Sequence, residues 1–218
     1  MYNLPVLDLP YPVILASGSP RRRSLLAQLI PSFEVHVVEL DEDELACSDP
    51  WGTAERLAQA KAIAVAAARP ECIVIGGDTV VALPHRRIGE SVVASYALLG
   101  KPETEEDACF MLRSLSAAEH EVITGVAIVT PHGTEVFSVT TGVLFRGLTD
   151  EEIGAYVATG EPMDKAGAYA IQGGAAGFVS ETRGSLSNVV GLPLEELELR
   201  LSRYAQMVAG SHPNPNQA

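Results

Sequence analysis

Three consecutive arginines follow the turn Ser17–Pro20, at the point where a helix is expected to begin. Ser19 is suited to cap that helix and Pro20 to fill its first position. Each arginine at the positive end of a helix dipole costs roughly 0.3–1 kcal/mol, so we expect an anion to compensate. Backbone N–H groups, the Ser17 hydroxyl and one guanidinium would together bind a phosphate well. The alternative is a solvent-exposed basic turn.

A single carboxylate, Asp78, follows two glycines inside the apolar run 71–83. The glycines are expected to interrupt this strand, so that the backbone approaches a ligand and the carboxylate stands at a strand end. Together with Glu39 and Asp41, which follow another expected strand, Asp78 would form an oxygen cluster suited to Mg²⁺ or Mn²⁺. Taken alone, Asp78 fits an Asx turn equally well, and the acidic run 39–44 fits solvated surface.

Three lysines add candidate cations. Lys61 lies on the apolar stripe of an alanine-rich helix, which indicates that its ammonium lines a cleft. Lys101 is held on a stiff corner by the proline that follows it, and Lys165 opens a glycine-rich segment. Gln172, further along that segment, carries an amide that can read the edge of a base. Each lysine alone fits an ordinary surface residue, whereas three at one cleft would clamp a polyphosphate.

Several common catalytic motifs are missing from the sequence. The stretch Gly100–Pro102 lacks the spacing of a Walker phosphate loop, and proline replaces the hydroxyl residue of that loop. The zinc-protease HExxH, the hydrolase GxSxG and the dinucleotide-binding GxGxxG patterns are absent. The 3 cysteines are far apart and odd in number, which argues against a disulfide framework and a zinc site.

The spacing of apolar residues predicts an α/β chain. Helices are expected from residue 20 and over 53–69, 104–116, 149–160 and 193–208. Strands are expected over 13–16, 33–37, 71–83, 122–130 and 134–146. The last two strands form a hairpin and are therefore antiparallel, so the sheet must be mixed. Glycines crowd the irregular segment 161–192, as is typical of a binding site.

Length and composition indicate one globular domain. With 218 residues, 47% hydrophobic and 20% charged, the chain is expected to form a core over 12–210, with loose termini at 1–11 and 211–218. A formal net charge of −13 repels nucleic acid, so neither DNA nor RNA is an expected partner. The apolar runs are shorter than the ~20 residues that a membrane span needs. The N-terminus lacks signal-peptide features, and we expect a cytoplasmic protein.

Seven motifs resemble those of the Maf family of nucleoside triphosphate pyrophosphatases. They are ASGSPRRRSLL (16–26), ERLAQAKA (55–62), IGGDTVV (75–81), GKP (100–102), MLRSLS (111–116), YVATGEPMDKAGAYAIQG (156–173) and VVGLPL (189–194). The resemblance implies a mixed, bent β-sheet flanked by helices, with two lobes around a deep cleft, in a homodimer. It also implies hydrolysis of a nucleoside triphosphate to the monophosphate and pyrophosphate, with a divalent metal cation, Mg²⁺ or Mn²⁺.

The resemblance also implies roles for individual residues. Asp78 matches the catalytic acid of the family, while the carboxylate cluster described above makes Asp41 and Asp78 the expected metal ligands. Arg21, Thr79 and Gln172 match the specificity positions and are similar to those of the branch that acts on dTTP and UTP. The other positions that face the substrate are matched by Ser17, Lys61, Lys101 and Lys165. The segment 84–99 is longer than is usual in the family.

The expected reaction is attack of water on the α-phosphorus, assisted by the metal, with Asp78 either as general base or as metal ligand. Two alternatives stay open at this point. The substrate could be 7-methyl-GTP or another modified nucleotide, or the protein could be a non-catalytic nucleotide-binding regulator of cell division.

Overall fold

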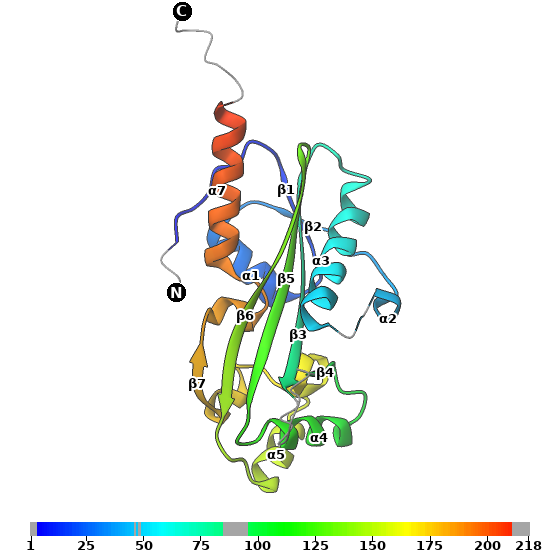
Figure 1. The fold of residues 1–218 in the computed structure, drawn as a ribbon, viewed down its shortest axis with the longest axis vertical. Coiled ribbons are helices and arrows are strands. Elements are labelled where there is room, and N and C mark those ends of the chain that lie inside the picture. Colours follow the sequence, from blue (N-terminus) through cyan, green and yellow to red (C-terminus); the bar gives the residue numbers. More distant parts are fainter. Residues whose placement is uncertain (1–3, 46, 48, 85–95, 211–218) are drawn as a thin grey trace, which may run out of the picture.

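The computed structural model describes residues 4–45, 47, 49–84 and 96–210, and it has a seven-stranded sheet at its centre (Figure 1). The strands are β1 (Val13–Ala16), β2 (Glu34–Val35), β3 (Ile73–Pro84), β4 (Tyr96–Leu99), β5 (Glu119–Thr130), β6 (Gly133–Phe145) and β7 (Val179–Arg183). Their order is β2-β1-β3-β5-β6-β7, and β4 also pairs with β3. Strand β1 is parallel to β2 and β3, while the other pairs are antiparallel. The predicted mixed sheet and its hairpin are confirmed.

The helices begin where capping residues allow. They are α1 (Pro20–Leu29), α2 (Glu42–Leu45), α3 (Pro50–Ala66), α4 (Glu105–Leu115), α5 (Asp150–Val157), α6 (Leu186–Val190) and α7 (Leu194–Gly210). Ser19 caps α1 as expected, and Thr104 and Thr149 form complete capping boxes. Helix α3 starts earlier than residue 53, because the Asp49 side chain accepts a hydrogen bond from the Gly52 N–H.

Helices cover both faces of the sheet, and alternate residues of each strand meet different helices. In β3, Ile73 and Ile75 pack in the cluster built around α1 and α7, while Val74 packs in the cluster around α3. Figure 1 shows α3 on one side of the long strands and α1 with α7 on the other. Because side chains alternate along a strand, Asp78 faces α3 and Thr79 faces α1.

The hydrophobic core divides between two lobes. One lobe contains α1, α3 and α7, and the other contains α4 and α5 with the cluster that includes Leu112, Leu115 and Ile153. Strands β3, β5 and β6 are long enough to run through both lobes (Figure 1). The α/β fold with helices flanking a mixed sheet is the one that the sequence predicts.

Strand β3 has a gap along one of its edges. Its pairing with β1 ends at Ala16 and Gly76, and its pairing with β4 begins at Leu99 and Val81. On the other edge, β5 pairs continuously along this stretch, so β3 is not interrupted at residues 76–79 and that prediction is wrong. Gly76 serves helix packing instead, because an added Cβ would collide with the Ala58 carbonyl oxygen of α3.

The ends of the domain differ from expectation in one respect. Residues 4–11 do not hang free, because Leu4, Leu7 and Leu9 pack against the core and the Leu7 N–H donates to the Leu29 carbonyl at 2.8 Å. The predicted loose end 211–218 and residues 85–95 of the long segment lie outside the described residues. Among the helices that are described, none has both the length and the apolar character needed to cross a bilayer.

The glycine-rich segment 161–192 is more ordered than the sequence indicates. It contains three short 3-10 turns, Glu161–Asp164, Ala166–Ala168 and Gly174–Phe178, followed by β7 and α6. Pattern analysis missed these elements because they are too short to show a clear apolar period.

Candidate active site

A cleft of about 890 Å³ opens at the gap between β1 and β4. Among the described residues, its lining comes from the turn and helix start after β1, the middle of β3, the stretch 98–101, residues 164–172 and residues 189–191. Residues 37, 38 and 42, three residues of α3 (Thr53, Leu57 and Lys61) and Val122 of β5 complete it. Within the described part of the chain, no strand pairs with this edge of β3 over residues 77–80, and side chains from both faces of β3, Asp78 and Thr79, line the cleft. All the residues predicted to contact substrate line this cleft, namely Ser17, Arg21, Lys61, Asp78, Thr79, Lys101, Lys165 and Gln172.

An ammonium group joins two carboxylates inside the cleft. Lys61 Nζ on α3 lies 2.7 Å from Asp78 Oδ1 and 2.7 Å from Glu42 Oε1. The side chains of Lys61 and Asp78 are only 14% and 12% exposed, so the pair is shielded from bulk water. Burial alone would raise the pKa of Glu42, but the hydrogen bond from Lys61 and the attraction of Lys61, Lys101 and Arg22 hold it below its usual value.

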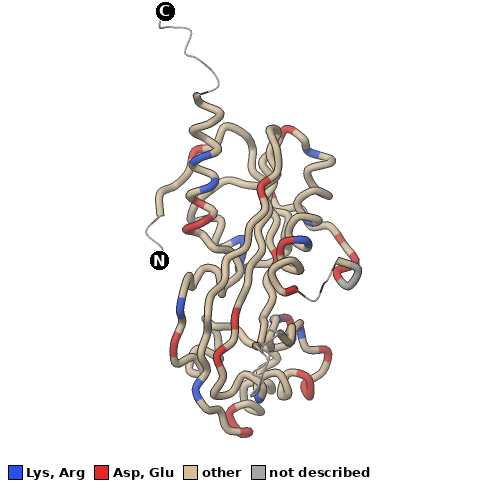
Figure 2. The backbone as a smooth tube through the Cα atoms, viewed as in Figure 1, with Lys and Arg blue, Asp and Glu red and all other residues tan. Residues whose placement is uncertain are grey.

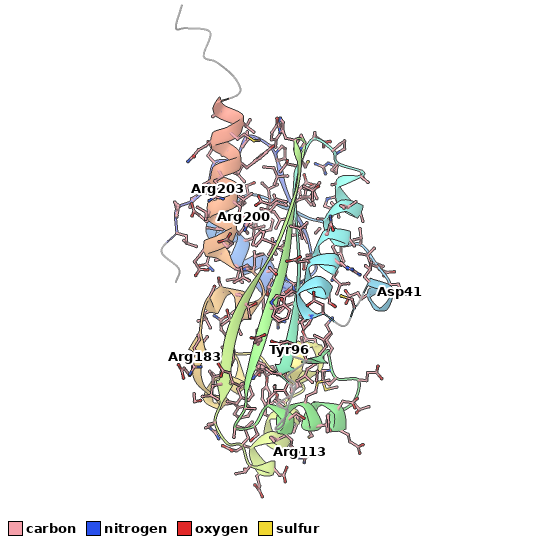
Figure 3. The ribbon with its side chains drawn as sticks, in the orientation of Figure 1. Asp41, Tyr96, Arg113, Arg183, Arg200 and Arg203 are labelled. Atoms are coloured by element: carbon pink, nitrogen blue, oxygen red, sulfur yellow. The ribbon has the colours of Figure 1, made fainter. Side chains whose placement is uncertain are left out.

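Glu42 takes the place in the cleft that Asp41 was expected to fill. Among the described residues that line the cleft, Glu42 is present and Asp41 is not. Figure 3 shows Asp41 at the outer side of the molecule beside α2. Asp41 precedes α2, which begins at Glu42, and in this acidic run it is the Glu42 carboxylate that contacts Lys61. Asp41 as a metal ligand stays a prediction.

The carboxylates of Asp78 and Glu42 fit a hard divalent cation. Their oxygens already converge on one cationic nitrogen, and Mg²⁺ is commonly held by one or two carboxylates together with phosphates and water. No cluster of three or more metal-binding side chains exists in the part of the chain that the structure describes. Mg²⁺ or Mn²⁺ held by two carboxylates would take its remaining ligands from water and from substrate phosphates.

Arg22 builds the opposite wall and was not singled out by the sequence. Its Nε donates to the Gly191 carbonyl at 2.8 Å, Nη1 to Ser17 Oγ at 3.2 Å and Nη2 to Thr79 Oγ1 at 2.9 Å. Burial lowers the pKa of Arg22, while the negative charges of Asp78 and Glu42 oppose that effect. The run of three arginines was the available signal, but only the tertiary structure shows that protein acceptors satisfy the middle one.

Ser17 is arranged to donate a hydrogen bond. Its Oγ accepts from Arg22 Nη1 and from the Ser19 N–H at 3.3 Å. Because Ser17 Oγ accepts both of these hydrogen bonds, its own hydroxyl hydrogen can point to an anion in the cleft.

Lys165 and Arg21 bring positive charge to the side of the cleft formed by the glycine-rich segment. Lys165 Nζ contacts Asp164 Oδ1 and lies 3.4 Å from the Glu161 carbonyl oxygen. The hydrogen bond and charge of Lys165, with a further contribution from Arg21, lower the pKa of Asp164. Arg21 and Gln172 also line a neighbouring cavity of about 610 Å³.

Lys101 reaches the cleft because of the direction of β4. This strand is antiparallel to β3 and ends at Leu99, beside the gap. The Gly167 N–H then donates to the Gly100 carbonyl at 3.0 Å, which ties this corner to the segment that carries Lys165. Gly167 has φ +68°, a conformation that favours glycine, and Val81 lies close to where a Cβ would be.

The local charge of the cleft is opposite in sign to that of the whole protein. Acidic residues are spread along both lobes (Figure 2) and the formal net charge is −13, yet among the described residues four cations line this one cleft beside Arg22. They are Arg21, Lys61, Lys101 and Lys165. Such an arrangement can bind a polyanion and hold an ionised carboxylate next to it.

The chain is similar to several known proteins. The sequence profile of the family described as Maf-like protein matches residues 12–204. A protein of Geobacillus sp. (strain WCH70) named dTTP/UTP pyrophosphatase is 48% identical over 191 residues, which cover 88% of this chain and 97% of the relative. One of the same name from Geobacter sulfurreducens is 47% identical over 197 residues, covering 89% and 97%. The solved Staphylococcus aureus Ham1 protein matches with TM-score 0.48 and 16% identity, covering 88% of this chain and 98% of that one.

Proposed function

The chain belongs to the Maf family, and we propose that it hydrolyses dTTP and UTP to the monophosphate and pyrophosphate. The observation that carries the proposal is the convergence of Asp78 with Lys61, Lys101 and Lys165 in one cleft. The names of the relatives, dTTP/UTP pyrophosphatase, support the choice of substrates.

Charge compensation is the first task of the site. A nucleoside triphosphate carries a charge of about −4, and its transfer chemistry depends mainly on positioning and on electrostatic stabilisation. Lys101 and Lys165 approach from β4 and from the glycine-rich segment, and Arg21 from the start of α1. The Ser17 hydroxyl adds a neutral donor to this set. These groups would bind the phosphates and stabilise the pyrophosphate as it leaves.

The proposed chemical step is attack of a water oxygen on the α-phosphorus. Asp78 accepts a proton from that water, while the bond from the α-phosphorus to the oxygen that bridges to the β-phosphate breaks. The bonding electrons leave with pyrophosphate. Lys61 holds Asp78 by one carboxylate oxygen, so the base is oriented before the substrate binds.

A divalent cation would be held by Asp78 and Glu42, which fit Mg²⁺ or Mn²⁺ as described above. When bound, such an ion supplies positive charge that offsets the negative charge of the triphosphate.

The test is a panel assay with the full chain. Release of pyrophosphate and monophosphate is measured for dTTP, UTP, CTP, ATP, GTP and 7-methyl-GTP, with Mg²⁺, with Mn²⁺ and with a chelator. We expect dTTP and UTP to be hydrolysed fastest and the chelator to stop turnover. Faster hydrolysis of 7-methyl-GTP, or nucleotide binding without any pyrophosphate, would contradict the proposal.

A further inference from the structure

A chain of hydrogen bonds leads from the cleft into the core through Thr79. Thr79 lines the cleft, and its Oγ1 lies 2.9 Å from Oγ1 of Thr124 on β5. Thr124 Oγ1 in turn lies 2.9 Å from the backbone carbonyl oxygen of Asn188. Thr124 and Asn188 are completely buried, so water does not enter this chain.

The last acceptor in this chain of hydrogen bonds, the backbone carbonyl oxygen of Asn188, determines which way each threonine hydroxyl donates. The Asn188 carbonyl can only accept, so the single hydroxyl hydrogen of Thr124 must lie in the contact between them. In the hydrogen bond between the two threonines, Thr79 must therefore be the donor and Thr124 Oγ1 the acceptor. In the opposite arrangement, two buried oxygens would face each other at 2.9 Å with no hydrogen between them, which is unfavourable.

Arg22 closes the other side of Thr79. A guanidinium only donates, so Thr79 Oγ1 accepts the 2.9 Å hydrogen bond from Arg22 Nη2. Thr79 therefore gives its hydrogen to Thr124 and receives one from Arg22. A hydroxyl in that state has no hydrogen for the cleft and can offer a ligand only its remaining lone pair.

The end of the chain is held rigidly. Asn188 Nδ2 donates to the Val122 carbonyl at 2.9 Å and to Thr141 Oγ1 at 3.0 Å, which fixes the orientation of the amide. The Gly191 N–H donates to the same Asn188 carbonyl at 2.9 Å. The backbone carbonyl of Asn188, which accepts the Thr124 hydroxyl hydrogen, is therefore held in place by hydrogen bonds on both sides of the residue.

We propose that Thr124 and Asn188 are positioning residues that make Thr79 a hydrogen-bond acceptor only, so that the site selects nucleosides presenting a hydrogen-bond donor to Thr79. This inference rests on the proposed function and extends it to the recognition of the nucleoside. Uracil and thymine carry a donor at N3, where cytosine has an acceptor, and the sugar carries hydroxyl donors. The shared chemistry is an N–H or O–H group directed at Thr79.

The test measures binding of non-hydrolysable α,β-imido nucleotides by calorimetry, which separates recognition from turnover. The ligands are the analogues of dUTP and dCTP and the 3′-deoxy form of the dUTP analogue. The main variant is Thr124→Val, which removes the acceptor for the Thr79 hydrogen at nearly constant volume. Thr124→Ser keeps the hydroxyl. Thr182→Val is the control, since Thr182 is a half-buried threonine on β7 and is not among the described residues that line the cleft.

We expect the wild-type protein to bind the uracil analogue more tightly than the cytosine analogue. In Thr124→Val the Thr79 hydroxyl is released and can donate, so this preference should fall about tenfold, the effect of one hydrogen bond. Thr124→Ser should restore the preference, and Thr182→Val should retain it. If Thr124→Val folds poorly, Thr79→Val provides the test, because it should weaken binding of the uracil analogue about tenfold with little effect on cytosine.

The sugar is distinguished from the base by the 3′-deoxy ligand. Weaker wild-type binding of this ligand, with no such loss in Thr124→Val, would support the inference and identify the donor as the sugar hydroxyl. The inference is overturned if Thr124→Val and Thr79→Val weaken all ligands by one common factor. Failure of the wild-type protein to bind any of them would instead overturn the proposed function, and this inference with it.

Discussion

Lys61 Nζ lies 2.7 Å from Asp78 Oδ1, a contact that joins helix α3 to the edge of β3 left open between β1 and β4. The same nitrogen holds Glu42. This pairing keeps a nearly buried carboxylate oriented within a cleft lined by cations. The site can therefore combine negative and positive groups without leaving either charge unpaired before a substrate binds.

Replacement of Asp78 by asparagine should remove the base and leave the shape of the site intact. We expect pyrophosphate release to fall by about 10²–10⁴, the usual contribution of general acid–base catalysis. Thermal unfolding should change little, since Lys61 retains its contact with Glu42. The control is Asp150→Asn, an exposed aspartate on α5 whose partner is Arg113. Wild-type turnover in Asp78→Asn would refute the assignment.

Replacement of Lys61 by glutamine should shift the pH dependence of turnover. Lys61 is the main group that lowers the pKa of Glu42, and its loss leaves two carboxylates without their shared cation. The pKa of Glu42 should rise, so the acidic limb of the kcat/KM profile should move to higher pH. Lys61→Arg keeps the charge and should leave the limb near its original position. An unshifted limb in Lys61→Gln would show that Glu42 does not limit the reaction at low pH.

Replacement of Arg22 by lysine should destabilise the wall of the cleft although the charge is kept. A lysine cannot reproduce the fork that contacts Ser17, Thr79 and Gly191 at once. We expect the free energy of unfolding to fall by about 1–3 kcal/mol and KM to rise, as measured by urea denaturation and steady-state kinetics. The neighbouring exposed Arg23 gives the matched control, Arg23→Lys. Equal effects at both positions would contradict a special role for Arg22.

The burial of His120 should make the fold sensitive to acid. Burial lowers the pKa of His120 from 6.5 to about 4, and its Nε2 lies 2.9 Å from the Tyr169 hydroxyl. The unfolded chain therefore binds a proton at a higher pH than the folded one. Stability from this residue is complete above pH 6.5 and is lost as pH falls toward 4, by roughly 3 kcal/mol in total.

Denaturation of wild type and His120→Gln across this pH range tests the effect. The variant should lose most of the pH dependence between 6.5 and 4, while His132→Gln, at an exposed histidine, should keep it. Parallel curves for wild type and His120→Gln would count against the buried histidine as the cause.

Local signals in the sequence determined many of the elements. Ser19 with Pro20, and the capping boxes of Thr104 and Thr149, mark helix starts by contacts within one turn, and such contacts do not depend on the rest of the fold. The hairpin of β5 and β6 follows equally from a short connection between two apolar strands. The placement of Lys61 on an apolar stripe correctly indicated a cleft.

The tertiary structure alone decided how the site is assembled. The position of Asp78 depends on where β1 ends and β4 begins along β3, and that register is set by the pairing of strands far apart in the sequence. The same holds for the choice of Glu42 over Asp41 and for the three acceptors of Arg22. The hydrogen bonds that link Thr79, Thr124 and Asn188 likewise join β3, β5 and α6, which are far apart in the sequence. A sequence encodes the types of these groups, whereas their distances follow only from the packing of the sheet and its helices.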